Sequence, residues 1–261
     1  MSQSLWISKT GLSAQDTRLA TIANNLSNAA TVGFKRDNVV FEDLLYQIRR
    51  QPGAQSSQST QLPSGMQVGT GVRVIGTQKE FSDGSVEITD KPLDLAIVGR
   101  GFFEILLPDG TSGYTRNGQF QVSADGEIVT ARGLILQPSI TVPPDAQTIT
   151  VSSDGIVEAT IAGSTTPQTL GTLTITNFVN PTGLQAIGAN LYLQTAASGS
   201  ATSGTPGTAG LGRLEQGALE NSNVDVVEEL VNMITTQRTY EMNSKVISTA
   251  DQMLQFISQN L

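Results

Sequence analysis

Residues 222–261 read SNVDVVEELVNMITTQRTYEMNSKVISTADQMLQFISQNL, and this stretch contains no proline and no glycine. Apolar or aromatic side chains recur in it at every seventh position, namely at Val226, Met233, Tyr240, Ile247, Leu254 and Leu261. A seven-residue spacing places side chains along one side of an α-helix, as in the seam of a coiled coil. The stretch is therefore predicted to be a long helix whose apolar row, together with Ile257, contacts a partner.

The N-terminal end carries the same spacing. Residues 1–30 are predicted to be a helix with an apolar row made of Leu5, Leu12, Leu19, Ile22 and Leu26. Such a row can also be the core-facing side of an ordinary globular helix. Its occurrence at both ends of the chain favours the other interpretation, in which the two termini pair with each other and with neighbouring copies.

The ends of both predicted helices carry capping signals. Ser2 or Ser4 is expected to cap the first helix, and Ser222 or Asn223 the second. The first helix is expected to weaken over the Asn- and Ser-rich residues 23–28, and Gly33 is expected to form a turn after it.

Residues 72–178 have the pattern of an antiparallel β domain. Short apolar or alternating runs occur at 93–98, 102–107, 119–122, 149–151, 157–161 and 173–175. Four Asp-Gly pairs lie among them, at 83–84, 109–110, 125–126 and 154–155. Asp-Gly favours tight turns because both residues tolerate positive φ.

Two stretches lack the apolar residues needed for a core. Residues 51–71 are rich in Gln, Ser, Pro and Gly, and residues 196–212 in Ala, Ser, Gly and Thr. We interpret the second as a surface loop. The first is predicted to be a linker in a monomer, or alternatively an arm that becomes ordered against neighbouring copies.

The composition restricts the function. The net charge is −8 and the isoelectric point is near 4.5, so a nucleic-acid surface is not expected. The chain contains no His and no Cys, which removes the usual general base, thiol nucleophiles and the usual zinc ligands. The first thirty residues contain no continuous apolar stretch, so neither a cleaved signal peptide nor a membrane insertion is expected.

Candidate chemical motifs are each better explained by structure. Gly99-Arg100-Gly101 lies between two predicted strands and does not open a helix, so it indicates a turn and not a phosphate site. Carboxylate pairs such as Glu42–Asp43 and Glu228–Glu229 have no aromatic platform beside them. Asp109, Asp125 and Asp154 lack calcium-loop spacing. We therefore predict no catalytic residue, no cofactor and no metal site.

Two terminal motifs resemble the bacterial flagellar axial proteins, the rod and hook family. The first is NNLSNAATVGF at 24–34, whose signature positions are Asn25, Leu26, Asn28, Thr31, Gly33 and Phe34. The second is the stretch 221–254. Residues 46–71 and GRGFFEILLPDGTSGYTRNGQF at 99–120 are similar to the distal-rod members of that family.

The resemblance implies an α+β fold with paired N- and C-terminal coiled-coil helices and a central antiparallel β domain. Residues 1–33 and 222–261 would form the assembly domain, 34–71 a segment reaching between subunits, and 72–221 the outer β domain. The implied role is a helical homopolymer forming a rigid, hollow drive shaft that carries torque from motor to hook.

The implied location is the flagellar basal body, spanning the periplasm, after export without a cleaved signal. The implied partners are copies of the chain, proximal rod and hook subunits, the surrounding periplasmic and outer-membrane ring proteins and the flagellar type III export apparatus. Three alternatives stay open: a hook or proximal-rod subunit of the same family, a secreted cell-wall-active β protein, and an adhesin or coat subunit.

Overall fold

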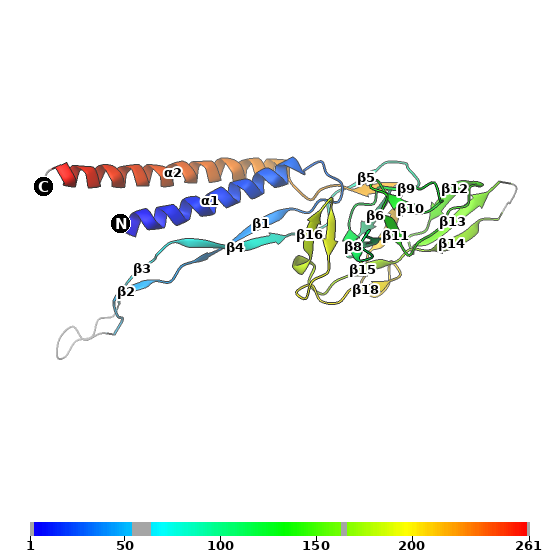
Figure 1. The fold of residues 1–261 in the computed structure, drawn as a ribbon, viewed down its shortest axis with the longest axis horizontal. Helices are drawn as coiled ribbons and strands as arrows, with labels where there is room; N and C mark the ends of the chain where they lie inside the picture. Colours follow the sequence, from blue (N-terminus) through cyan, green and yellow to red (C-terminus); the bar gives the residue numbers. More distant parts are fainter. Residues whose placement is uncertain (1–2, 54–63, 163–165, 260–261) are drawn as a thin grey trace. The chain divides into compact units, whose positions relative to one another are not determined.

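The computed structural model describes residues 3–53, 64–162 and 166–259. One helix lies at each end of the chain and antiparallel strands lie between them, which confirms an α+β fold with a central antiparallel β domain. The chain forms two compact units (Figure 1). Unit 1 comprises residues 1–27, 37–78 and 225–261, and unit 2 comprises 28–36 and 79–224. The three-part division expected from the sequence, with borders at residues 33, 71 and 221, concerns the assembled protein and stays a prediction.

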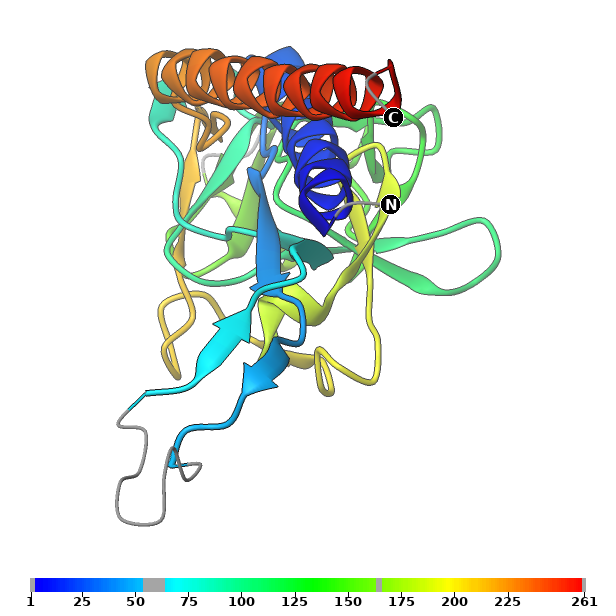
Figure 2. The same cartoon turned by 90° about the vertical axis from the view of Figure 1, so that its left-hand side faces the viewer.

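Unit 1 contains the two helices and two ribbons of paired strands. Helix α1, Gln3–Ser27, and helix α2, Val226–Gln259, lie side by side and run in opposite directions (Figures 1 and 2). Strand β1, Asp37–Asp43, lies against α1 and is hydrogen-bonded to β4, Val72–Lys79. Strand β2, Gln47–Arg50, pairs with β3, Met66–Val68. A linker throughout 51–71 is therefore wrong at its C-terminal end, while residues 54–63 lie outside the described part.

The helix ends differ from the sequence prediction. The α2 cap is Asp225, whose carboxylate accepts hydrogen bonds from Val227 N at 2.8 Å and Glu228 N at 3.2 Å. The prediction of Ser222 or Asn223 was wrong, because the helix begins later than expected. Ser4 lies inside α1 and so does not cap it, and Ser2 is outside the described residues.

Unit 2 contains the remaining strands. Among its described residues, one antiparallel sheet has the order β16-β17-β8-β7-β11-β10-β9, a second has the order β12-β13-β14, and three further pairs are β15–β18, β19–β6 and β20–β5. Their bounds are β5 Val86–Ile88, β6 Leu95–Val98, β7 Phe103–Leu106, β8 Ser112–Thr115, β9 Phe120–Val122, β10 Ile128–Thr130, β11 Ile135–Gln137, β12 Ala146–Val151, β13 Ile156–Ile161, β14 Gln168–Thr172, β15 Ile175–Asn177, β16 Gln185–Gly188, β17 Leu191–Leu193, β18 Thr202–Gly204, β19 Arg213–Gln216 and β20 Ala218–Glu220, with a short 3-10 helix η1 at Pro181–Gly183.

Most predicted turns join paired strands. The Asp-Gly pairs at 109–110, 125–126 and 154–155 connect β7 to β8, β9 to β10 and β12 to β13. In each, the glycine N–H donates to the carbonyl three residues earlier. The pair at 83–84 joins no hairpin, because the following strand β5 pairs with the distant β20. The expected loop at 196–212 contains a strand, β18, which pairs with β15.

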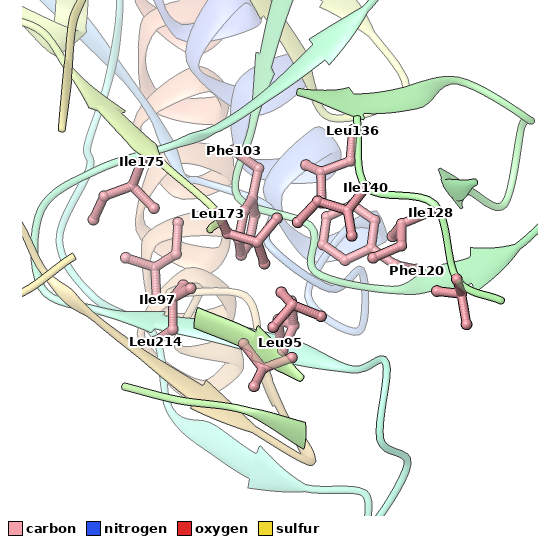
Figure 3. Packing of buried hydrophobic residues seen from close by; sticks show 13 residues of the cluster. Leu95, Ile97, Phe103, Phe120, Ile128, Leu136, Ile140, Leu173, Ile175 and Leu214 are labelled. Carbon is pink, nitrogen blue, oxygen red and sulfur yellow. The ribbon is translucent and has the colours of Figure 1, made fainter. Parts of the chain in front are cut away.

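The core of unit 2 is aliphatic with a few aromatic rings (Figure 3). Phe103 and Phe120 meet edge to face, with ring centroids 5.1 Å apart. A second cluster is mainly aromatic and consists of Phe102, Tyr114, Phe178, Leu184 and Tyr192. These two clusters give unit 2 a hydrophobic core of its own. We call unit 2 the β body.

Candidate assembly site

Asn25, the first signature position, links three segments within unit 1. Its side-chain amide is almost fully buried. It donates to Asp37 O at 2.9 Å and accepts from Asp37 N at 2.9 Å. The same NH2 group donates to the Glu229 carboxylate at 3.4 Å. Because an amide both donates and accepts, it substitutes for a strand neighbour at the start of β1 while also holding the first turn of α2.

The next signature positions form the turn after α1. Thr31 N donates to Asn28 O at 3.0 Å, and the Thr31 hydroxyl donates to Asn28 Oδ1 at 3.2 Å. Gly33 has φ +69°, and a Cβ there would lie 2.7 Å from Asn117 N. Gly33 N donates to Glu220 O at 2.7 Å. Glycine is required here by both its conformation and the close approach of another backbone segment.

Lys35, which directly follows the signature, is fully buried. Its ammonium group donates to Glu220 Oε1 at 2.6 Å and to Ser82 O at 2.5 Å. Glu220 Oε1 also accepts from Gly84 N at 3.0 Å. Burial lowers the pKa of Lys35, and the negative charge of Glu220 opposes this shift. The pair joins the signature turn to β20, the last strand before α2.

Arg116 is the second buried cation beside Glu220. It donates to Glu220 Oε2 at 3.2 Å and to the carbonyls of Ile97 and Gly99 at 3.1 and 2.7 Å. A partly exposed carboxylate, that of Asp83, lies 3.3 Å from it. We call Lys35, Glu220 and Arg116 the ion cluster. Glu220 pairs with both buried cations and Asp83 supplies a second negative charge beside Arg116, so removing the charge of Glu220 is expected to be costly.

Asn223 plays in unit 2 the part that Asn25 plays in unit 1. Its Oδ1 accepts from Arg36 N at 2.8 Å, and its Nδ2 donates to Glu80 O at 2.9 Å and to Ser82 Oγ at 3.0 Å. Arg36, Glu80 and Asn223 itself all lie within two residues of a border of unit 2 in the sequence. The amide of Asn223 therefore joins three chain segments inside unit 2. Each of the two asparagines thus holds together separate segments of its own unit.

The contact between α1 and α2 is not formed by the predicted apolar rows alone. Besides Ile22, the buried residues of α1 are Ser8, Ala14 and Asn25, and those of α2 are Glu229 and Thr236. A Cβ on Gly11 would lie 3.3 Å from the Asn243 side chain, so the helices approach closely there. Gln15 Oε1 is buried without a hydrogen-bond partner among the described residues. Two close approaches between the helices, Asn25 with Glu229 and Gly11 with Asn243, therefore involve polar or small residues and none of the predicted row residues.

The predicted rows lie beside this contact. Of the N-terminal row only Ile22 is buried, while Leu5, Leu12, Leu19 and Leu26 are half-buried. Of the C-terminal row, Met233 and Ile247 are half-buried, and Val226, Tyr240 and Leu254 are exposed. The side chain of Ile257 and all of Leu261 lie outside the described part. Burial in the subunit therefore leaves much apolar surface on these rows.

The sequence did not indicate the ion cluster, and it suggested Asn223 only as a helix cap and not as a group that joins segments of unit 2. Lys35 and Glu220 are separated by 185 residues, and no spacing rule links them. A usable signal for Glu220 was its position directly before the C-terminal motif. Glu229 was considered as part of the carboxylate pair Glu228–Glu229, whereas its carboxylate accepts a hydrogen bond from Asn25.

Neither metal ligation nor membrane spanning is found in the described residues. No group of three or more Asp or Glu side chains there is arranged to hold a metal ion. Across the same residues, neither helix is both long and apolar enough to cross a membrane.

Three family descriptions match successive parts of the chain. The flagella basal body rod protein family matches residues 5–35. The D1 domain of the flagellar hook protein FlgE/F/G family matches 96–159, and the C-terminal region of the flagellar basal body rod FlgEFG proteins matches 215–260. The quoted motifs at 24–34, 99–120 and 221–254 lie inside these three regions.

Full-length relatives point to one member of the family. A protein named flagellar basal-body rod protein FlgG from Buchnera aphidicola subsp. Schizaphis graminum is 53% identical over 99% of this chain and 100% of its own length. One of the same name from Caulobacter vibrioides is 49% identical over 98% of each chain. A flagellar hook protein FlgE from Salmonella typhimurium is 26% identical over 94% of this chain and 96% of its own.

Proposed function

The chain belongs to the family of flagellar basal-body rod proteins, as a structural subunit of the rod and not an enzyme, and we propose that its terminal helices join copies of it into a helical polymer. The observation that carries the proposal is the apolar surface left on the two helices. Where the two helices meet, Asn25 lies against Glu229 and Gly11 beside Asn243, while most of the apolar side chains on both helices are half-buried or exposed and remain available to neighbours.

Helix α2 has a second apolar row that the heptad analysis did not single out. It consists of exposed side chains, namely Val227, Leu230, Val231, Ile234, Met242, Val246, Met253 and Phe256. Contiguous exposed apolar surface of this kind marks an interaction site. Burial of one such side chain contributes about 1.5–3 kcal/mol. Several together therefore compete with the roughly 4–15 kcal/mol that association costs.

The predicted rows complete this interface. Leu5, Leu12, Leu19 and Leu26 from α1, and Val226, Met233, Tyr240, Ile247, Leu254 and Ile257 from α2, form coiled-coil contacts between copies, while Ile22, which is buried inside the subunit, supports them from within. In this arrangement the polar contact inside each subunit sets the helix pair, and the apolar rows hold the pairs together.

The polymer is the distal part of the rod, a rigid and hollow drive shaft that passes torque from the motor to the hook. Its end partners are proximal rod and hook subunits, since chains with similar terminal helices can pack by similar contacts. It spans the periplasm inside the periplasmic and outer-membrane ring proteins. The subunit reaches this place through the flagellar type III export apparatus, without a cleaved signal.

Two alternatives from the sequence are not favoured. Relatives named FlgG share 49–53% identity over nearly the whole chain, against 26% for the hook protein, which argues against a hook subunit. A cell-wall-active enzyme is not favoured because the family is structural.

The experiment is a charge substitution on the exposed row of α2. Val231 is 55% exposed, so Val231→Asp removes little packing from the subunit, and we expect a small change in its thermal unfolding while rods fail to form in cells. Val231→Ile keeps an apolar side chain at the same position and should assemble. Electron microscopy of isolated basal bodies measures rod formation. Normal rods from the Val231→Asp variant would show that this row is not an assembly surface.

A further inference from the structure

Val179 stands out on the surface of unit 2. This residue is 91% exposed, although it lies between a buried aromatic residue, Phe178, and the short helix η1. The turn that presents it is firmly held. Asn180 N donates to Ser198 O at 3.2 Å, and Asn180 Nδ2 donates to Ala197 O at 3.0 Å. A single exposed aliphatic side chain is common on protein surfaces. Val179 differs because its turn is fixed by these bonds and because the same unit carries a groove and flanking charges that match it.

The same unit contains a shallow apolar groove. Its volume is about 380 Å³, and it lies where the β7–β8 and β10–β11 turns meet. Its walls are formed by Leu106, Leu107, Pro108, Leu134 and Ile135. None of the side chains that line the groove is charged, so it suits an aliphatic side chain.

Opposite charges flank the two features. Arg100 is exposed and lines the same hollow as Val179, and no ion pair of its side chain is found within the described residues. Asp109 is exposed at the rim of the groove, between Pro108 and Gly110. Its carboxylate accepts from Thr111 N at 3.0 Å and Thr111 Oγ1 at 2.6 Å, and these bonds lower its pKa, so it is ionised at neutral pH.

We propose that Val179 of one copy inserts into the groove at Leu107 and Leu134 of a second copy, with Arg100 of the first beside Asp109 of the second. The proposal rests on the polymer proposed above and adds a contact between β bodies to the contact between helices. Subunits with a net charge of −8 repel one another. A contact that pairs a cation with an acidic rim reduces that repulsion where the copies meet.

The geometry of this contact suits a filament. Val179 and the groove are different surfaces of one unit, so the contact is head-to-tail and is not a closed two-fold pair. A head-to-tail contact that does not close into a ring continues as an open helix. Each added copy would then present a new Val179 and a new groove.

Disulfide trapping tests the contact directly. The chain contains no cysteine, so any disulfide in isolated rods must come from introduced residues. With Val179→Cys and Leu134→Cys in the same chain, mild oxidation should give a ladder of dimers, trimers and longer species on non-reducing gels. Rods that mix the two single variants should stop at dimers. A disulfide within one monomer would overturn the proposal.

Substitutions give an independent measure. Val179→Asp should raise the protein concentration needed for assembly by roughly tenfold or more. Ile88→Asp is the matched control, since Ile88 is 72% exposed in the same unit but belongs to neither surface. Arg100→Asp and Asp109→Lys should each raise it by about two- to fivefold, and the double reversal should restore it.

Taken together, these experiments test the groove contact and the helix-based polymer separately. If Val231→Asp abolishes assembly and Val179→Asp assembles normally, the groove contact is wrong and the helix-based polymer stands. Equal losses for Val179→Asp and Ile88→Asp would also overturn it, because the effect would then not belong to the proposed surface. If Val231→Asp leaves assembly intact while the disulfide ladder forms, the β bodies make the contact and the helix proposal is wrong.

Discussion

At the scale of single residues, a few polar groups hold together separate segments of each unit: Asn25 and Glu220 are buried, and Asn223 is half-buried. Asn25 and Asn223 each hold three chain segments through one amide, and Glu220 accepts from two cations and one backbone N–H. Such groups stabilise the native arrangement only while every partner is present, because an unsatisfied buried polar group costs about 1–3 kcal/mol. Their influence should therefore appear as large losses from small substitutions.

Glu220→Gln tests the ion cluster. The amide keeps the shape of the side chain but takes the negative charge away from Lys35 and leaves Arg116 with only the exposed Asp83 as an ion-pair partner among the described residues, so we expect unit 2 to lose about 3–5 kcal/mol of unfolding free energy. Glu80→Gln is the matched control, because Glu80 makes a partly exposed ion pair with Arg36 at 2.8 Å. Its loss should be below about 1 kcal/mol. Urea denaturation measures both, and similar losses would show that the ion cluster contributes no more than a surface pair.

Gly33→Ala tests the signature turn. The alanine would adopt positive φ, and its Cβ would meet the backbone of Asn117 and Arg116 at 2.7–2.9 Å. Gly110→Ala shares the positive φ, at +81°, but has nothing within 4 Å of the added Cβ. We expect about 1–2 kcal/mol for Gly110→Ala from the conformation alone and clearly more for Gly33→Ala. Equal melting temperatures for the two variants would contradict a tight contact at Gly33.

What the sequence could predict at this scale depended on local rules. Gly33 and the Asp-Gly turns were predictable because backbone conformation restricts the residue type at one position. The ion cluster was not, because its members come together only when the strands are placed, and burial of a lysine or a glutamate runs against their usual preference for solvent.

At the scale of elements, local patterns in the sequence predicted both helices and some of the strands, but not which faces of these elements meet. The short apolar or alternating runs coincide with five strands of unit 2, namely β6, β7, β9, β12 and β13, and reach the first residue of β15. The other, mostly very short strands of unit 2 were not predicted, because three or four residues are too few to show a period of two. The seven-residue rows correctly indicated helices but not which face meets the partner inside the subunit. Every face of a helix repeats at about seven residues, whether its side chains are polar or apolar. From the sequence alone, the apolar face is the one expected to contact the other helix.

The polar helix contact predicts that the terminal helices open before the β body. Limited proteolysis of the dilute subunit should cut within α1 and α2 first, especially beyond Ala250, where every described side chain of α2 is exposed. Unit 2, with its own core, should survive as the protected fragment. Mass spectrometry of the fragments over time measures this order. Equal resistance of helices and β body in the monomer would contradict it, and assembled rods provide the comparison in which the helices should be protected.

At the scale of the whole molecule, a single copy exposes apolar side chains that we expect neighbouring copies to bury. The ribbon of β2 and β3 shows this outside the helices. It exposes Leu45, Tyr46, Ile48 and Met66, and a two-stranded hairpin alone is marginally stable in water. A polymer cannot be deduced from the core of one copy, because the contacts that define it are absent until a second copy arrives.

The same reasoning gives a prediction for the segment between β2 and β3. Deleting residues 54–63 leaves Gln51-Pro52-Gly53 and Ser64-Gly65 to join the two strands, a loop length that hairpins commonly use. We expect the thermal unfolding of the subunit to stay the same, because unit 2 has its own core and the ribbon is exposed. We expect the rods to bend more easily or to vary in length, since contacts that cross between copies must break when a shaft bends.

A variant with a ten-residue Gly-Ser sequence in place of 54–63 separates length from composition. If the segment stiffens the rod through specific contacts, this variant should bend like the deletion; if it acts only as a spacer, the variant should resemble the wild type. Electron microscopy of isolated rods measures their curvature and length. Straight rods of normal length from the deletion would show that the stiffness arises from the helices and β bodies instead. A lowered melting temperature of the subunit would show that the segment stabilises the monomer.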